Sequence, residues 1–204
     1  MSTINLFHTG FAVIPEPDIH YGRQNADFGQ GFYLSDNEEF SRRWAQERRG
    51  QTTYLNRYEL DCAGLKIKRF RKDEEWFNYI YDNRTLRPDA LKEYDVIVGP
   101  IANDTIYDTW GILTSGLISR ENALQLLLIG PAYEQTVLKT DRAAGALHFL
   151  GAEEIKPEAI KAYRAILKQE EEIFQQEFAE TLEKLSLRFR PDAKNAMVTK
   201  AQTL

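Results

Sequence analysis

Two short segments near the start of the chain combine residue types that suit the binding of a flat, charged ligand. Residues 4–10 (Ile-Asn-Leu-Phe-His-Thr-Gly) have the pattern of a strand, and residues 27–35 (Asp-Phe-Gly-Gln-Gly-Phe-Tyr-Leu-Ser) follow after a loop. The paired glycines let a backbone come close to a planar molecule, and Phe32 and Tyr33 offer faces on which a heteroaromatic ring can stack. With His8 placed 25 positions before Tyr33, the two segments together predict a nucleotide site.

Each of these features, taken alone, also has a purely structural interpretation. A lone His such as His8 often caps a strand end, and aromatic residues beside glycines often belong to a core strand. Trp44, on the next predicted helix, is expected in the core, with a second wall of the ligand slot as the alternative. The combination of the two segments favours the ligand site, and this site requires that the His8 imidazole and the Tyr33 ring line one shared pocket.

In this order the two segments resemble the opening of the NAD-binding core of ADP-ribosyltransferases of the His-Tyr-Glu type. The resemblance implies that NAD is the substrate, that His8 binds a ribose hydroxyl and that Tyr33 stacks on nicotinamide. It also implies that backbone at Thr9 and Gly10 holds the nicotinamide amide. The family usually has Gly directly after the His, whereas this chain has Thr9 before Gly10.

The resemblance further implies a Glu at the start of a late strand, where it bonds the reacting ribose and supports an oxocarbenium-like transition state. Residues 131–138 (Pro-Ala-Tyr-Glu-Gln-Thr-Val-Leu) offer two candidates, Glu134 and its rival Gln135. A carboxylate can stabilise growing positive charge on the sugar, whereas an amide can position a hydroxyl but brings no charge. If Gln135 faces the cleft, the alternation of a strand sends Glu134 to the other face.

A wider set of residues consists of His8, Arg23, the segment 27–33, Asn83, Arg84, residues 94–100 (Tyr-Asp-Val-Ile-Val-Gly-Pro), residues 102–104 (Ala-Asn-Asp) and Gln135. Together they resemble a bacterial domain family of unknown function within the same superfamily, over roughly residues 4–150. Arg forks suit a diphosphate, and polar residues at a strand exit suit a loop site. The additional candidates for contacts with the cofactor, a phosphate or the target are Arg23, Phe28, Gly31, Arg84, Asn103 and Asp104. For Asp104 the capping of a helix N-terminus is the favoured alternative.

Composition narrows the class of protein. The 204 residues carry 26 Lys and Arg against 31 Asp and Glu, a formal net charge of -5 that disfavours a general nucleic-acid coat. Cys62 is the only cysteine, which fits a reducing compartment, and we expect the cytoplasm. The three histidines show no metal-ligand spacing, and no apolar stretch is long enough to span a bilayer, so we expect neither a metal nor a membrane role.

The hydrophobic pattern predicts interleaved strands and helices, hence an α+β domain, and the resemblance implies a split β-sheet core with flanking helices. A Ser-x-x-Glu capping box at Ser35 predicts a helix over residues 36–49 that buries Phe40 and Trp44. The other predicted helices cover residues 73–81, 104–113 and 120–128, and a long amphipathic helix follows Pro157. The predicted strands cover residues 4–8, 28–35, 52–61, 65–70, 94–100, 134–139 and 147–150.

These expectations give a domain of residues 1–155, a long amphipathic helix over 156–188 and a flexible tail over 189–204. The resemblance implies a mono-ADP-ribosyltransferase that transfers ADP-ribose from NAD to a macromolecule, more readily a protein than a nucleic acid. It also implies a possible toxin or phage-defence role with a small neutralising partner, for which the acidic helix offers a surface. The alternatives are a non-catalytic NAD- or nucleotide-binding module of the same fold and an NAD glycohydrolase.

Overall fold

The computed structural model describes residues 3–101, 122, 125, 126, 128–130 and 133–188. Asn103, Asp104, the tail from 189 and most of the helices predicted over 104–113 and 120–128 lie outside the described residues. Contacts divide the chain into one unit of residues 1–103 and 131–170 and a second of residues 104–130 and 171–204. The candidate residues that the structure describes all belong to the first unit.

A three-stranded antiparallel sheet holds the first strand and its neighbours. It has the order β1-β3-β7, with β1 spanning Thr3–Gly10, β3 spanning Thr53–Asp61 and β7 spanning Leu147–Ile155. His8 of β1 is opposite Asn56 of β3. The strands β1 and β3 confirm the alternating patterns of the sequence, and β7 runs further than the predicted residues 147–150.

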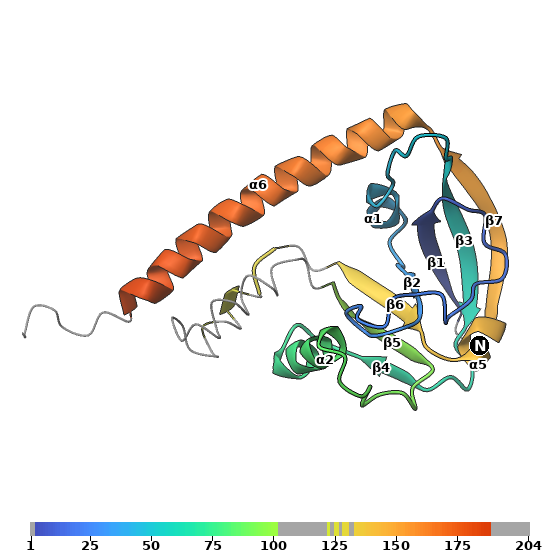
Figure 1. Cartoon of the computed structure of the whole chain (residues 1–204), viewed down its shortest axis with the longest axis horizontal. Coiled ribbons are helices and arrows are strands. Elements are labelled where there is room, and N and C mark those ends of the chain that lie inside the picture. Colours follow the sequence, from blue (N-terminus) through green and yellow to red (C-terminus); the bar gives the residue numbers. More distant parts are fainter. Residues whose placement is uncertain (1–2, 102–121, 123–124, 127, 131–132, 189–204) are drawn as a thin grey trace, which may run out of the picture. The chain divides into compact units, whose positions relative to one another are not determined.

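A four-stranded sheet holds the Gly-x-Gly segment. Its order is β2-β6-β5-β4, with β2 spanning Phe32–Leu34, β6 Glu134–Leu138, β5 Val96–Pro100 and β4 Ile67–Arg69. The pairs β2–β6 and β6–β5 are antiparallel and β5–β4 is parallel. Every residue of β5 is buried, as its apolar run predicts for an interior strand (Figure 1).

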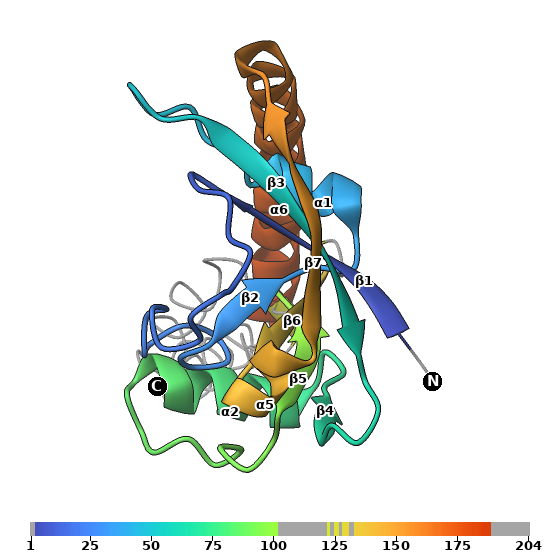
Figure 2. The same cartoon turned by 90° about the vertical axis from the view of Figure 1, so that its right-hand side faces the viewer.

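The two sheets meet where β1 passes β2. Phe7 and Ser35 exchange both backbone hydrogen bonds, at N···O distances of 2.8 and 2.9 Å. Ser35 also donates from Oγ to the carbonyl oxygen of Glu134, at 3.2 Å. Strands β1, β2 and β6 are therefore tied together at one residue. Figure 2 shows these three strands close to one another.

The first helix, α1, spans Glu38–Arg43 and is shorter than the predicted 36–49. Its cap is Asn37, whose side chain accepts from the Phe40 amide, so the predicted capping box at Ser35 is wrong. Ser35 is occupied in the strand junction instead, because its Oγ bonds Glu134 and the Asn37 amide. Phe40 is buried as expected, but Trp44 ends the helix with 56% of its surface exposed, so the core prediction for Trp44 is wrong.

The other described helices are α2, α5 and α6. Helix α2 spans Glu74–Arg84, is capped by Asp73 and packs through Trp76, whose indole N–H donates to the Pro100 carbonyl at 2.9 Å. A short helix α5, Asp141–Gly145, was not predicted from the sequence. Helix α6 spans Pro157–Arg188 and confirms the long C-terminal helix, so the mixed α+β class is also confirmed. Within the described part of the chain, no helix combines the length and apolar character that crossing a membrane requires.

Candidate functional site

His8 lies at the point where β1 and β2 stop pairing. Its Nδ1 is 2.8 Å from the carbonyl oxygen of Tyr33. A carbonyl only accepts, so Nδ1 carries the proton and Nε2 is left as a hydrogen-bond acceptor. Burial lowers the pKa of His8, against the opposite effect of the bond to Tyr33. The neutral imidazole with an accepting Nε2 is therefore the form at neutral pH.

Gly10 keeps that nitrogen uncovered on one side. A Cβ atom at Gly10 would lie 3.1 Å from His8 Nε2, closer than side chains normally approach. The glycine thus has a structural reason beside the predicted role of its backbone in holding an amide. An acceptor that is fixed by its own strand and left uncovered by its neighbour suits a hydroxyl donor such as a ribose.

The rings of His8 and Tyr33 lie on opposite faces of β2. The His8 ring packs on Phe32, with centroids 4.7 Å apart. Since successive side chains of a strand point to opposite faces, Tyr33 faces away from Phe32 and therefore away from the imidazole. The prediction that both rings line one pocket is wrong in that form. What the two residues share is the hydrogen bond across the end of the β1–β2 pairing.

Tyr33 is held by the loop that precedes it. Its hydroxyl donates to the Gly29 carbonyl at 2.7 Å and accepts from the Phe28 amide at 3.0 Å. Burial raises the pKa of Tyr33 well above its usual value, and the neighbouring Asp27 adds to this effect. The phenol therefore stays protonated, and Tyr33 can offer a ring surface but not an acid or a base.

Strand register decides between the two candidates on β6. Tyr33 is opposite Val137, so Gln135, two residues away, shares the face of Tyr33. Glu134 points to the other face and is exposed. The Gln135 Nε2 donates to Oδ2 of Asp27 at 3.3 Å. Gln135 is therefore the residue that the fold brings to the Tyr33 face, and which of the two bonds the reacting ribose stays a prediction.

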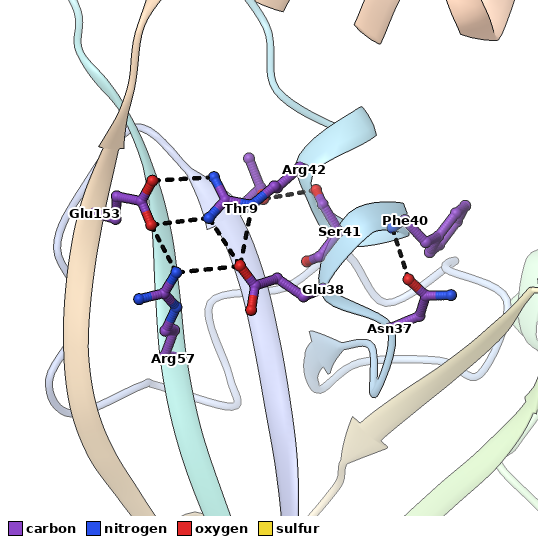
Figure 3. A network of polar contacts seen from close by, with 8 residues as sticks. All are labelled: Thr9, Asn37, Glu38, Phe40, Ser41, Arg42, Arg57 and Glu153. Atoms are coloured by element: carbon purple, nitrogen blue, oxygen red, sulfur yellow. Dashed lines mark hydrogen bonds and ion pairs between the residues drawn. The ribbon is translucent and has the colours of Figure 1, made fainter. Parts of the chain in front are cut away.

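Helix α1 is tied to β1 on the face opposite His8. Thr9 donates from Oγ1 to the Ser41 carbonyl at 2.6 Å (Figure 3). Four charged side chains, which we call the α1 ion cluster, hold the same helix to β3 and β7: Glu38, Arg42, Arg57 and Glu153.

Each guanidinium of the α1 ion cluster bonds both carboxylates. Arg42 bonds Glu38 and Glu153 at 2.8 Å each, and Arg57 bonds Glu38 at 3.1 Å and Glu153 at 2.6 Å. Hydrogen bonds from Arg42 lower the pKa of Glu38 and of Glu153. The helical spacing of Glu38 and Arg42 is a usable sequence signal. Nothing in the sequence points to Glu153, which lies 111 positions from Arg42.

Two predicted cofactor contacts have structural roles. Phe28 is 0% exposed and stacks on Phe70 and Tyr79, so it holds the loop and does not reach a ligand. A Cβ on Gly31 would lie 2.5 Å from the Leu138 carbonyl oxygen, so this glycine admits a neighbouring strand and not a ligand. The predicted direct contacts of Phe28 and Gly31 with the cofactor are therefore wrong.

The arginine candidates differ. Arg84 bonds Oδ1 of Asp27 through Nε at 2.8 Å and Nη2 at 2.6 Å, so a phosphate would have to compete with that carboxylate. Arg23 is exposed and lies close enough to Tyr33 to lower its pKa, against the larger effect of burial. Trp44 keeps most of its surface open beside Phe40. Among the described residues, no group of three or more His, Cys, Asp and Glu side chains could hold a metal ion.

Comparison with known proteins gives one match. A family model described as protein of unknown function (DUF3990) matches residues 4–149, which is more than half of the chain. No curated protein and no solved structure matches this chain. The match covers the two sheets that hold the candidate residues, up to Phe149 in β7.

Proposed function

We propose that this chain, which belongs to the DUF3990 family of proteins of unknown function, is an NAD-dependent mono-ADP-ribosyltransferase. The observation that carries the proposal is the junction at Ser35, which bonds Phe7 of β1 through its backbone and Glu134 of β6 through its hydroxyl. His8, Tyr33 and Gln135 are each at most two residues from this junction. Three segments that are far apart in the sequence, and that together resemble a transferase motif, are thus joined at one point, and this supports the proposal.

The Tyr33 face suits the nicotinamide end of NAD. It presents an aromatic ring fixed by two hydrogen bonds, and Gln135 follows along the neighbouring strand. Aromatic stacking favours a pyridinium ring, and an amide side chain can bond a ribose hydroxyl. The His8 Nε2 acceptor serves a hydroxyl on the other side of the β1–β2 pairing.

The proposed reaction breaks the bond between nicotinamide nitrogen and C1′ of the ribose. The bonding electrons leave with nicotinamide, and positive charge develops on the sugar. A nucleophile of the acceptor then forms the new bond to C1′ and releases its proton to solvent. Gln135 positions a ribose hydroxyl through this step, and Tyr33 holds the leaving ring so that C1′ stays exposed to the acceptor.

A non-catalytic NAD-binding module of the same fold is the second candidate. The observation that favours it is the neutral amide of Gln135 where a transferase of this type is expected to present a carboxylate. A neutral group binds the ground state but offers less to the charged transition state. NAD hydrolysis with water as acceptor is a third outcome, which uses the same residues.

One experiment separates these functions. The purified chain is incubated with a bacterial lysate and NAD labelled on the adenylate half, beside Tyr33→Ala, His8→Ala and Gln135→Ala variants. Label on a macromolecule that depends on all three residues supports transfer. Free ADP-ribose indicates hydrolysis, and calorimetric binding of NAD without nicotinamide release indicates the module. If calorimetry gives no heat with NAD, all three functions are rejected.

A further inference from the structure

We infer that Asp27, held by Arg84, is a positioning residue that fixes the amide of Gln135 with its carbonyl oxygen toward the substrate. This inference rests on the proposed function, since it names the atom that Gln135 presents to the ribose. It follows from three contacts around one carboxylate that joins a loop, a helix end and a strand start.

The first step is the hold on Asp27. Arg84, the last residue of α2, gives both Nε and Nη2 to the same oxygen, Oδ1. The side chains of Arg84 and Asp27 are only 9% and 14% exposed. Two charge-assisted bonds in a shielded place fix the carboxylate plane. Oδ2 is therefore presented in a set direction.

The loop backbone at Asp27 is fixed as well. Asn83 donates from Nδ2 to the Asp27 carbonyl at 3.2 Å and to the Tyr79 carbonyl at 3.0 Å. Lys139 bonds the Phe28 carbonyl and forms an ion pair with Asp89 at 2.9 Å. Helix α2 and Lys139, the residue after β6, thus both hold the loop, so the position of Asp27 is fixed relative to its neighbours.

The second step is the orientation of Gln135. Its amide approaches Oδ2 of Asp27 at 3.3 Å. An ionised carboxylate only accepts hydrogen bonds, so the nitrogen must face Asp27 and the oxygen must point the other way. The flipped amide would place two acceptors against each other. Gln135 therefore offers an acceptor to the open side, as the carboxylate of a transferase would.

This arrangement makes Glu a poor replacement for Gln135. A carboxylate at that place would lie beside the carboxylate of Asp27, and like charges at such a distance raise a carboxyl pKa. The repulsion should turn the new side chain away from its bonding position, so Gln135→Glu should weaken NAD binding at pH 7 by about tenfold, which is the loss of one hydrogen bond of about 1.4 kcal/mol. Adding Asp27→Asn should restore binding, because the new amide can donate to the new carboxylate and still accept from Arg84.

The test uses the full chain and four variants: Gln135→Glu, Asp27→Asn, the double variant, and Asp82→Asn as a control that removes a carboxylate from the exposed side of α2. NAD affinity is measured by calorimetry, and the carboxyl introduced by Gln135→Glu is titrated by NMR with and without Asp27→Asn. Thermal unfolding reports any general loss of the fold. We expect both single site variants to bind NAD more weakly, the double variant to recover, and the control to match the parent.

The outcomes separate the inference from the function on which it rests. If the parent binds NAD and Gln135→Glu binds it equally well or better, with no recovery in the double variant, the positioning role is refuted. If the introduced carboxyl titrates at the same pH whether residue 27 is Asp or Asn, the contact itself is refuted. A parent that does not bind NAD overturns the proposed function, and with it the role toward a ribose, even where the titration shows the contact.

Discussion

Two ionic clusters of the same chemistry, one beside helix α1 and one beside helix α2, have very different settings. The α1 ion cluster has side chains that are 17% to 45% exposed. On the α2 side, Asp27 and Arg84 are 14% and 9% exposed, and Lys139 is only 5% exposed. Solvent screens the charges of the α1 ion cluster and can solvate a side chain that loses its partner. The shielded charges on the α2 side depend on their protein partners instead. The ion pairs of the two clusters therefore contribute unequally to the fold and to the site.

The largest expected effect comes from breaking the shielded pair. Arg84→Met leaves the Asp27 carboxylate without its two strongest bonds, and we expect the free energy of unfolding to fall by about 3 kcal/mol. Arg57→Met in the α1 ion cluster is the matched change, with an expected loss below about 1 kcal/mol. Urea denaturation of both variants measures the difference. Equal losses would show that burial does not separate the two clusters.

Salt should act on one cluster more than on the other. Glu153→Gln removes the charge that Arg42 and Arg57 share, and we expect it to cost about 1 kcal/mol at low ionic strength and less at 1 M salt, where the Debye length is about 3 Å. The cost of Arg84→Met should change little over the same range. Denaturation series at several salt concentrations test this, and a salt-insensitive Glu153→Gln would contradict the screened character of the α1 ion cluster.

The pH dependence of stability should separate His8 from the carboxylates. The folded pKa of His8 lies below 6.5, so below pH 6.5 the unfolded chain binds a proton that the native chain does not. Stability should therefore fall as the pH falls from 7 toward 5, and His8→Gln should remove this slope. Glu38 and Glu153 have lowered pKa values, so their contribution is present above pH 4.5 and is lost as the pH falls below it. Thermal unfolding between pH 4 and 8 tests the assignment, and an unchanged slope in His8→Gln would refute it.

The smallest effect on stability should come from Gly10→Ala. The added methyl group needs only a small shift of the His8 ring, so we expect a cost below about 1 kcal/mol. NAD affinity should fall by about fivefold, because the methyl group covers Nε2 and one lost hydrogen bond is worth about 1 kcal/mol. Calorimetry beside thermal unfolding gives both numbers. If affinity and stability changed in proportion, Gly10 would have only a packing role.

Local patterns were sufficient for much of this fold. Three local patterns each predict the observed element: the alternation in residues 53–61, the apolar run of residues 96–100 and the helical spacing after Pro157. Burial on one or both faces of an element determines the types of a few neighbouring residues, so it can be recognised locally. The predicted extent of α1 was wrong, because Asn37 and not Ser35 caps its N-terminus. Ser35 has the right chemistry for that cap, but its hydroxyl is used by a strand that begins 99 positions later.

The sequence supplied candidate residues but not their orientation. His8 and Tyr33 were predicted from their types and spacing, and Glu134 and Gln135 from the resemblance to ADP-ribosyltransferases. Whether Glu134 or Gln135 shares a face with Tyr33 depends on strand register, and register is set by partners far along the chain. The link between Asp27 and Gln135 spans 108 positions and carries no local signal. Trp44 was assigned to the core from its helical spacing with Phe40, although α1 ends before it is covered.

The brevity of β2 gives the bonds of Ser35 a further significance. A strand of three residues has few ladder bonds to hold its alignment. A slip of one residue would move Tyr33 to the other face and bring Phe32 or Leu34 into its place. The hydroxyl and backbone of Ser35 fix that alignment at the end of the strand. The side of the sheet on which Tyr33 lies is thus determined by a small serine.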